Sequence, residues 1–305
     1  MQVMTKPALI VGLGEVLWDI LPSGKVLGGA PANFAYMTNV LGDEGIVASR
    51  IGNDELGREA CRVMQGLGLN TAYVQRDDEH ETGTAAVSID PAGQPNFTIK
   101  ELAAWDFLQC TAEWEELSSR ADVICFGSLA QRSPASAVAV ESFLQNAPPK
   151  SLRIFDVNLR QSFYDQDVLR KSLRRAHIVK LNDQELHQVS RLLNMGVGTD
   201  ETLARRLLNE HGLMLVSVTR GARGSILVSQ SQTVEHSGFR VKIADAIGAG
   251  DAFTACLAHY YLRAHSLEDL SDLANRFASW VATQRGATPP INASQLQDIF
   301  TGAIR

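Results

Sequence analysis

The sequence of 305 residues lacks the phosphate-binding loop GxxxxGKS/T, because its only Gly-Lys pair, Gly24-Lys25, is followed by Val26. A nucleotide-binding protein of the P-loop class is therefore excluded. A dinucleotide fingerprint is also incomplete, since the segment Gly12–Leu17 reads GLGEVL and has a leucine in the place of the third glycine. That glycine allows close packing of the helix on the strand. Its absence argues against a dinucleotide-dependent dehydrogenase.

Cysteine is scarce, and positive charge is scattered rather than clustered. The four cysteines form no CxxC pair and the seven histidines form no HExxH motif, which argues against a disulfide framework and a zinc site. No run approaches the ~18 apolar residues of a membrane span, and no basic segment followed by an apolar run opens the chain. With a formal net charge of −6 and dispersed Lys and Arg, the surface does not suit nucleic acid or an anionic membrane. We expect a cytoplasmic protein.

Short apolar runs rich in β-branched residues alternate with segments of helical spacing. The predicted strands are Ala8–Gly14, Gly45–Ala48, Val123–Phe126, Arg153–Asp156, Ile178–Leu181 and Met214–Thr219. The predicted helices are Pro31–Leu41, Glu55–Leu67, Pro134–Asn146, Val168–Arg175 and Glu201–Asn209, with Asp54 and Ser133 as caps. This alternation predicts an α/β fold with a mostly parallel sheet covered on both faces.

Three further strand-like segments break this alternation. Val16–Leu21 alternates strictly, and Thr84–Ile89 and Phe97–Lys100 flank the turn signal Asp90–Gly93 like a hairpin. These segments are too short to form a domain alone. We predict a small sheet hinged to the main body.

The strongest local motif is Asp245–Asp251, which reads DAIGAGD and runs straight into the apolar helix Ala252–Leu262. Small residues before a helix leave backbone N–H groups uncovered at its positive end, where an anion can bind. An aspartate there can take a proton from an attacking hydroxyl while the N–H groups stabilise phosphoryl oxygens. An ordinary acidic cap on a buried helix explains the same residues equally well.

A second motif, Gly28–Asn33, reads GGAPAN and opens the first helix. Its two glycines allow a ligand to approach the backbone, and Asn33 offers a donor and an acceptor that suit sugar hydroxyls. Taken alone, the motif also fits a tight turn with a capping asparagine.

Three other segments follow predicted strands. Thr219–Gly224 fits a nucleotide-binding turn or a plain glycine-rich hairpin. Asn182 and Glu185 have the spacing to share magnesium-bound water, but a capping box has the same spacing. Asp156–Arg160, which reads DVNLR, lies at the carboxyl end of a strand, where open α/β sheets bind ligands, although such residues also anchor loops.

The order of these motifs is more specific than any one of them. With Gly28–Asn33 near one end and Asp245–Ala258 near the other, the chain resembles the ribokinase-like (PfkB) carbohydrate kinase family over nearly its whole length. The resemblance implies a three-layer α/β/α sandwich in which the small sheet is a lid, with lid segments at about 15–28 and 83–108 of a single domain spanning 1–305. Ala246 departs from the Thr or Ser that is commoner in the family.

The resemblance also implies roles for individual residues. Asp251 is the expected catalytic base, and the N–H groups of Gly248, Ala249 and Gly250 the anion hole. The expected sugar ligands are Asp19, Gly28, Gly29, Asn33 and Arg160. ATP is expected at Thr219, Gly221, Gly224, Asn275 and Asn182, magnesium through water at Asn182 and Glu185, and a potassium ion at Asp245 and the Ile247 carbonyl.

Within the family, Gly28–Asn33 together with Gly14–Asp19 looks most like fructokinases. Asp19 fits a sugar site, because a carboxylate beside Leu17 and Leu21 needs a donor and sugar hydroxyls supply one. The expected reaction is phosphorylation of the terminal hydroxyl of D-fructose. A 2-keto-3-deoxygluconate kinase is the alternative, since both types carry the pattern at Asp156–Arg160, and a catalytically silent sugar-binding regulator is a third reading. The edges of the lid strands predict a homodimer that pairs lid against lid.

Overall fold

The computed structural model describes residues 6–21, 24–89 and 95–302, and the predicted turn at Asp90–Gly93 lies outside these residues. Its central sheet has the strand order β13-β12-β11-β10-β9-β8-β1-β4-β5. The strands are β1 (Leu9–Leu13), β4 (Glu44–Gly52), β5 (Val74–Asp77), β8 (Val123–Phe126), β9 (Leu152–Asp156), β10 (Ile178–Asn182), β11 (Leu215–Thr219), β12 (Ser225–Ser229) and β13 (Thr233–His236). All neighbouring pairs from β5 to β11 are parallel, and β12 and β13 add an antiparallel edge.

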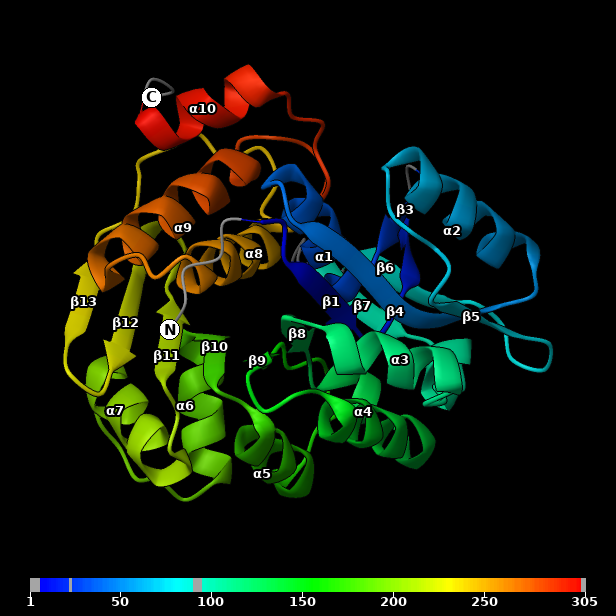
Figure 1. The fold of residues 1–305 in the computed structure, drawn as a ribbon, viewed down its shortest axis with the longest axis horizontal. Coiled ribbons are helices and arrows are strands. Elements are labelled where there is room, and N and C mark those ends of the chain that lie inside the picture. Colours follow the sequence, from blue (N-terminus) through cyan, green and yellow to red (C-terminus); the bar gives the residue numbers. More distant parts are fainter. Residues whose placement is uncertain (1–5, 22–23, 90–94, 303–305) are drawn as a thin grey trace.

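Helices cover both faces of this sheet, as predicted (Figure 1). One face carries α3 (Ala112–Arg120), α4 (Pro134–Asn146), α5 (Gln166–Arg175), α6 (Asp183–Leu192) and α7 (Asp200–His211). The other carries α1 (Ala30–Val40), α2 (Glu55–Gly66), α8 (Ala249–Leu262), α9 (Leu267–Ala282) and α10 (Ala293–Thr301). Among the described residues, none of the helices is long and apolar enough to cross a bilayer.

The predicted small sheet is also present. It contains β2 (Leu17–Leu21), β3 (Gly24–Gly28), β6 (Gly83–Ile89) and β7 (Pro95–Ile99) in the order β3-β2-β6-β7. β6 and β7 pair antiparallel, as expected of a hairpin, whereas β2 runs parallel to β6. Its strands come from two separate parts of the chain, β2–β3 and β6–β7, and each part is joined to the main body at both of its ends.

The two predicted helix caps have different outcomes. Asp54 caps α2, because its Oδ1 accepts from the backbone N–H of Gly57 at 2.7 Å. Ser133 occupies the N-cap position of α4, but its hydroxyl donates to the carbonyl of Asp106. The prediction of a side-chain cap at Ser133 is therefore wrong, because a tertiary acceptor competes for that hydroxyl.

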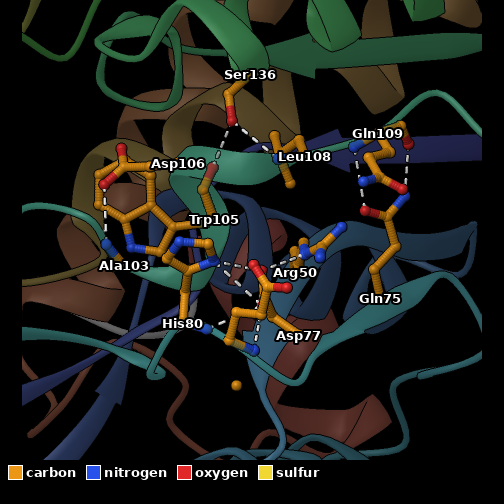
Figure 2. Close-up of polar contacts among 12 residues, drawn as sticks. Arg50, Gln75, Asp77, His80, Ala103, Trp105, Asp106, Leu108, Gln109 and Ser136 are labelled. Atoms are coloured by element: carbon orange, nitrogen blue, oxygen red, sulfur yellow. Dashed lines mark hydrogen bonds and ion pairs between the residues drawn. The ribbon is translucent and has the colours of Figure 1, made fainter.

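Figure 2 shows the polar contacts where the small sheet joins the main body. Before β6, Asp77 accepts from Arg50 Nε at 2.7 Å and lies 3.2 Å from His80 Nδ1. After β7, the Ser136 hydroxyl donates to the Trp105 carbonyl at 2.7 Å (Figure 2). These bonds fix the chain on either side of the β6–β7 hairpin to the ends of β4 and β5 and to α4.

Candidate active site

A small pocket lies at the carboxyl ends of β1, β8 and β9, where the N-termini of α1 and α8 also converge. Glu15, Pro31, Cys125, Asp156 and Asp251 are among its lining residues. The strand order reverses at this place, because the chain builds β4 and β5 on one side of β1 and β8 to β11 on the other. Open α/β sheets bind ligands at such a reversal. The pocket is therefore the candidate active site.

Asp251 and Asn33 meet across this pocket. Asn33 Nδ2, in the first turns of α1, donates to Asp251 Oδ2, in the first turn of α8, at 2.8 Å. Burial and the nearby charge of Asp156 raise the pKa of Asp251 to about 6, although the Asn33 bond opposes this. A carboxylate with such a pKa is largely ionised at neutral pH and basic enough to accept a proton.

The glycine before α8 has a conformation and a setting that no other residue fits. Gly248 is its N-cap with φ +79°, and a Cβ there would lie 2.6 Å from the Cα of Ala287. This packing aims the start of α8 at the pocket, as an anion hole requires. The Ala249 N–H donates to the Ala246 carbonyl at 3.3 Å, a long bond that a phosphoryl oxygen would have to replace.

The other glycine motif packs against the expected sugar-binding carboxylate. A Cβ on Gly28 would lie 2.5 Å from Asp19 Oδ2. Gly29 has φ +113°, and its Cβ would lie 2.5 Å from the Glu15 carbonyl oxygen. Burial raises the pKa of Asp19, and the charge of Arg160 opposes the shift. Gly28 therefore packs on Asp19, and the charge of Arg160 acts on that carboxylate.

Arg160 is exposed on the loop that follows β9. Its positive charge lowers the pKa of Glu15, Asp19, Glu185 and Asp251, each of which is otherwise raised mainly by burial. The loop is fixed beneath it, since the Leu159 N–H donates to Glu185 Oε1 at 2.9 Å. Arg160 thus lies among the carboxylates of the pocket and is accessible to a ligand.

Asn182 and Glu185 form a capping box at the start of α6. The Asn182 N–H donates to Glu185 Oε2, and the Glu185 N–H donates to Asn182 Oδ1, both at 2.8 Å. Each Glu185 carboxylate oxygen accepts one backbone hydrogen, which leaves further lone pairs for metal-bound water. In the described parts of the chain, no three His, Cys, Asp or Glu side chains gather as a direct metal site.

The Thr219–Gly224 segment turns from β11 into antiparallel β12. Gly224 has φ +78°, and a Cβ there would lie 2.0 Å from the His236 carbonyl oxygen. The buried Asn275 of α9 donates from Nδ2 to the Ser225 hydroxyl at 2.8 Å, which places it behind this turn. The expected nucleotide residues Thr219, Gly224 and Asn275 therefore lie in one region at the end of β11 and the start of β12.

Asp245 ties the loop before α8 to the segment that follows α9. Its Oδ1 accepts from the Ile247 N–H at 3.0 Å, and its Oδ2 accepts from the Gly286 N–H at 3.2 Å. These bonds support the anion loop next to Ala287. Further lone pairs on the carboxylate remain available to a cation.

Three polar residues of the site were not predicted from the sequence. Glu15 is 4% exposed, and burial raises its pKa to about 7. Lys180 is 8% exposed in the middle of β10, and its Nζ lies 3.1 Å from both carboxylate oxygens of Asp156. The Thr254 hydroxyl lies 2.9 Å from Asp156 Oδ2. A charged residue inside an otherwise apolar strand was the one available signal, and it could have identified Lys180 but not its contact with Asp156.

Comparison with known proteins gives a consistent result. The model of the pfkB family of carbohydrate kinases matches residues 23–294. The chain is 28% identical over 307 residues to a fructokinase of Escherichia coli, covering 93% of this chain and 96% of that protein. A structure of the uncharacterised sugar kinase PH1459 of Pyrococcus horikoshii with ATP aligns at a TM-score of 0.80 with 26% identity, covering 95% and 100%.

A structure of a fructokinase variant of Vibrio cholerae bound to fructose, ADP and a potassium ion aligns at a TM-score of 0.82. It is 23% identical and covers 97% of this chain and 99% of that chain. At this identity the likeness concerns the fold. The predicted ribokinase-like fold is confirmed by these neighbours.

Proposed function

The chain belongs to the pfkB family of carbohydrate kinases, and from this premise we propose that it transfers the γ-phosphoryl group of ATP to the terminal hydroxyl of D-fructose. The products are fructose 6-phosphate and ADP. Phosphotransfer to a carbohydrate follows from the family, whereas fructose is the finer part of the proposal. The observation that supports the mechanism most directly is the 2.8 Å hydrogen bond between Asn33 and Asp251 at the N-terminus of α8.

In this mechanism Asp251 accepts the proton of the sugar hydroxyl as its oxygen attacks the γ-phosphorus. The bond between the γ-phosphorus and the oxygen that bridges it to the β-phosphate breaks, and ADP leaves with that oxygen. The N–H groups of Gly248, Ala249 and Gly250 stabilise the charge that develops on the phosphoryl oxygens. Asn33 holds the carboxylate of Asp251 in place through its side-chain amide.

The sugar lies between the small sheet and the main body. Asp19 and Asn33 accept and donate to its hydroxyls beside Gly28 and Gly29, and Arg160 closes the far end. The small sheet acts as a lid with segments at about 15–28 and 83–108. Ile20 and Val26 on its strands are 37% and 44% exposed, and a lid-to-lid homodimer would cover such apolar side chains.

The nucleotide occupies the region of Thr219, Gly221, Gly224 and Asn275. Asn182 and Glu185 would hold the water shell of a magnesium ion, which would supply positive charge to the phosphates. A potassium ion beside the anion loop would take oxygen ligands from Asp245 and the Ile247 carbonyl. A relative of the same fold is bound to potassium, which supports this assignment.

Glu185→Gln should raise the magnesium concentration needed for half-maximal activity several-fold. The substitution removes the charge that holds metal-bound water. Its single amide oxygen can keep one of the two backbone bonds that Glu185 accepts, from Asn182 or from Leu159. A magnesium titration of the initial rate measures the change. Asn182→Asp is the companion variant, because it retains the cap and adds charge. If the titration of the folded Gln variant matches that of the parent, Glu185 serves only as a capping-box residue.

The ratio of kcat/KM for D-fructose to kcat/KM for 2-keto-3-deoxygluconate, at saturating ATP, tests the substrate. We expect fructose to be preferred, and Arg160→Lys to cost fructose only a modest loss of affinity, because no carboxylate loses a bidentate partner. The exposed guanidinium of Arg160 is the feature that favours the acid as the alternative. A tenfold preference for the acid overturns the fructose assignment and leaves the kinase mechanism intact. Absence of ADP release with every sugar would favour a silent sugar-binding regulator.

A further inference from the structure

Lys180 is a buried cation that the mechanism above does not use. It is the third residue of β10, where Ile178, Val179 and Leu181 are fully buried and apolar. Taking an ammonium group out of water costs several kcal/mol unless charge and hydrogen bonds compensate it. A lysine in this place therefore needs a partner of opposite charge, and the position of that pair calls for an explanation.

The partner is Asp156, directly opposite Lys180 on the neighbouring strand β9. Lys180 Nζ lies 3.1 Å from both carboxylate oxygens, and the two side chains are only 10% and 8% exposed. The Thr254 hydroxyl of α8 lies 2.9 Å from Asp156 Oδ2 and 3.0 Å from the Gly250 carbonyl oxygen. Thr254 thus links the pair to the first two turns of the helix that carries Asp251.

Lys180 also lies directly against that turn. A Cβ built on Gly250 would lie 3.1 Å from Lys180 Nζ, and Gly250 immediately precedes Asp251. The ammonium group is therefore placed between the Asp156 carboxylate and the backbone that aims Asp251 at the pocket. Its position suits an electrostatic role better than a purely structural one, since a buried pair of this kind is weak support for stability.

We propose that Lys180 is a positioning residue whose ammonium group offsets the charge of Asp156 and so keeps Asp251 ionised near neutral pH. This inference rests on the proposed function, in which Asp251 is the base. Without Lys180, Asp251 would face two other carboxyl groups, Asp156 and Glu15, with Arg160 as the remaining cation. Like charges favour protonation of a carboxylate, and a protonated Asp251 cannot accept the sugar proton.

The charged groups that act on Asp251 lie on β9 and β10 and on the segments that follow β1 and β9. Glu15 follows β1, Asp156 and Arg160 lie on β9 and its loop, and Lys180 lies on β10. Asp156 acts to raise the pKa of Asp251, whereas Lys180 and Arg160 act to lower it. The thiol of Cys125 on β8 also faces the site, but burial raises its pKa well above the usual value, so it stays neutral.

Burial also acts to lower the pKa of Lys180 itself. The neighbouring carboxylates, first that of Asp156, outweigh burial and raise it. Lys180 therefore remains charged throughout the pH range in which Asp251 titrates. The two halves of the pair should accordingly shift the titration of Asp251 in opposite directions.

The test measures the acid limb of kcat/KM against pH for Lys180→Met, Asp156→Asn and the double variant. Lys180→Met should move the limb upward by about one pH unit, and Asp156→Asn should move it downward by a similar amount. The double variant should return it close to the parent. Lys171→Met, which removes an exposed lysine on α5, is the charge control and should leave the limb in place.

Loss of packing would lower kcat/KM of both single variants without moving the acid limbs of their pH profiles in opposite directions. The proposal is overturned if the acid limb lies at the same pH in the parent and the variants, or if it moves in the same direction in both single variants. If Lys180→Met fails to fold, the downward shift in Asp156→Asn and its reversal in the double variant still decide the question, because the double variant buries no unpaired charge.

A second measurement separates this inference from the proposed function. Carbon-13 NMR titration of the aspartate carboxyl groups, with Asp251 assigned through Asp251→Asn, reports its pKa without any turnover. If the pKa of Asp251 shifts in opposite directions in Lys180→Met and Asp156→Asn, but the parent phosphorylates no sugar, the role of Lys180 is supported and the kinase assignment is contradicted. If the parent is an active kinase but the pKa of Asp251 is the same in both variants, the kinase assignment stands and the role of Lys180 is contradicted.

Discussion

Asp251→Asn should lower kcat by roughly 10²–10⁴-fold with little change in sugar affinity, because an amide keeps the shape of the carboxylate but cannot accept the proton. The Asn33 amide can still donate to the remaining side-chain oxygen. Because burial raises the pKa of Asp251 to about 6, the activity of the parent should fall as the pH drops below that value. The rate of ADP release at saturating fructose, measured across pH, checks both expectations.

Asp269→Asn is the matched control. Asp269 is the third residue of α9, as Asp251 is of α8, but it is exposed and remote from the pocket. It should retain the turnover of the parent. An Asp251→Asn rate within a few-fold of the parent would reduce Asp251 to an acidic residue at a helix N-terminus.

Gly248→Ala should lower kcat by about 10²-fold or more. The added methyl group would lie 2.6 Å from the Cα of Ala287, so the backbone itself must move. That movement displaces the N–H groups proposed to stabilise the phosphoryl oxygens, and loss of one such donor costs about 10²–10³-fold. Steady-state kinetics should show the loss in kcat rather than in KM for the sugar.

Gly68→Ala separates this collision from backbone strain. Gly68 has φ +76°, close to the +79° of Gly248, but a Cβ there has no atom within 4 Å. The variant should lose about 1–2 kcal/mol of stability, as expected for a left-handed residue with a side chain, and keep its kcat. Equal losses of kcat in the two variants would mean that the packing of Gly248 on Ala287 is not what shapes the anion hole.

The inner strands of the parallel sheet were predictable because they are buried on both faces, unlike the edge strand β5, which was not predicted. Val123–Phe126, for example, reads VICF, and such a run needs no knowledge of its neighbours. The edge strand β13, which reads TVEH, has no apolar run and was not predicted. Helix α6 was also missed, because it begins directly after β10 with no linker to mark its start.

The predicted site residues were those with a motif of their own, such as Asn33 and Asp251. The contacts of Lys180 and Thr254 with Asp156 had no local signal, because they depend on the register of β9 against β10 and on how α8 packs over the sheet. A single sequence contains no information on such a register. The bond between Asn33 and Asp251 was not predicted, because it joins two motifs at opposite ends of the chain.

That bond joins residues 218 positions apart, and it has a consequence for synthesis. Helix α1 packs against α8, in the core cluster that also holds the apolar residues of α9. At about 5–20 residues per second, α8 follows α1 from the ribosome after roughly 10–45 s. During that interval the nascent chain already carries the glycines proposed to bind the sugar but lacks the proposed base, and the apolar face of α1 lacks its partner. The growing chain should therefore be a client for chaperones before it can be an enzyme.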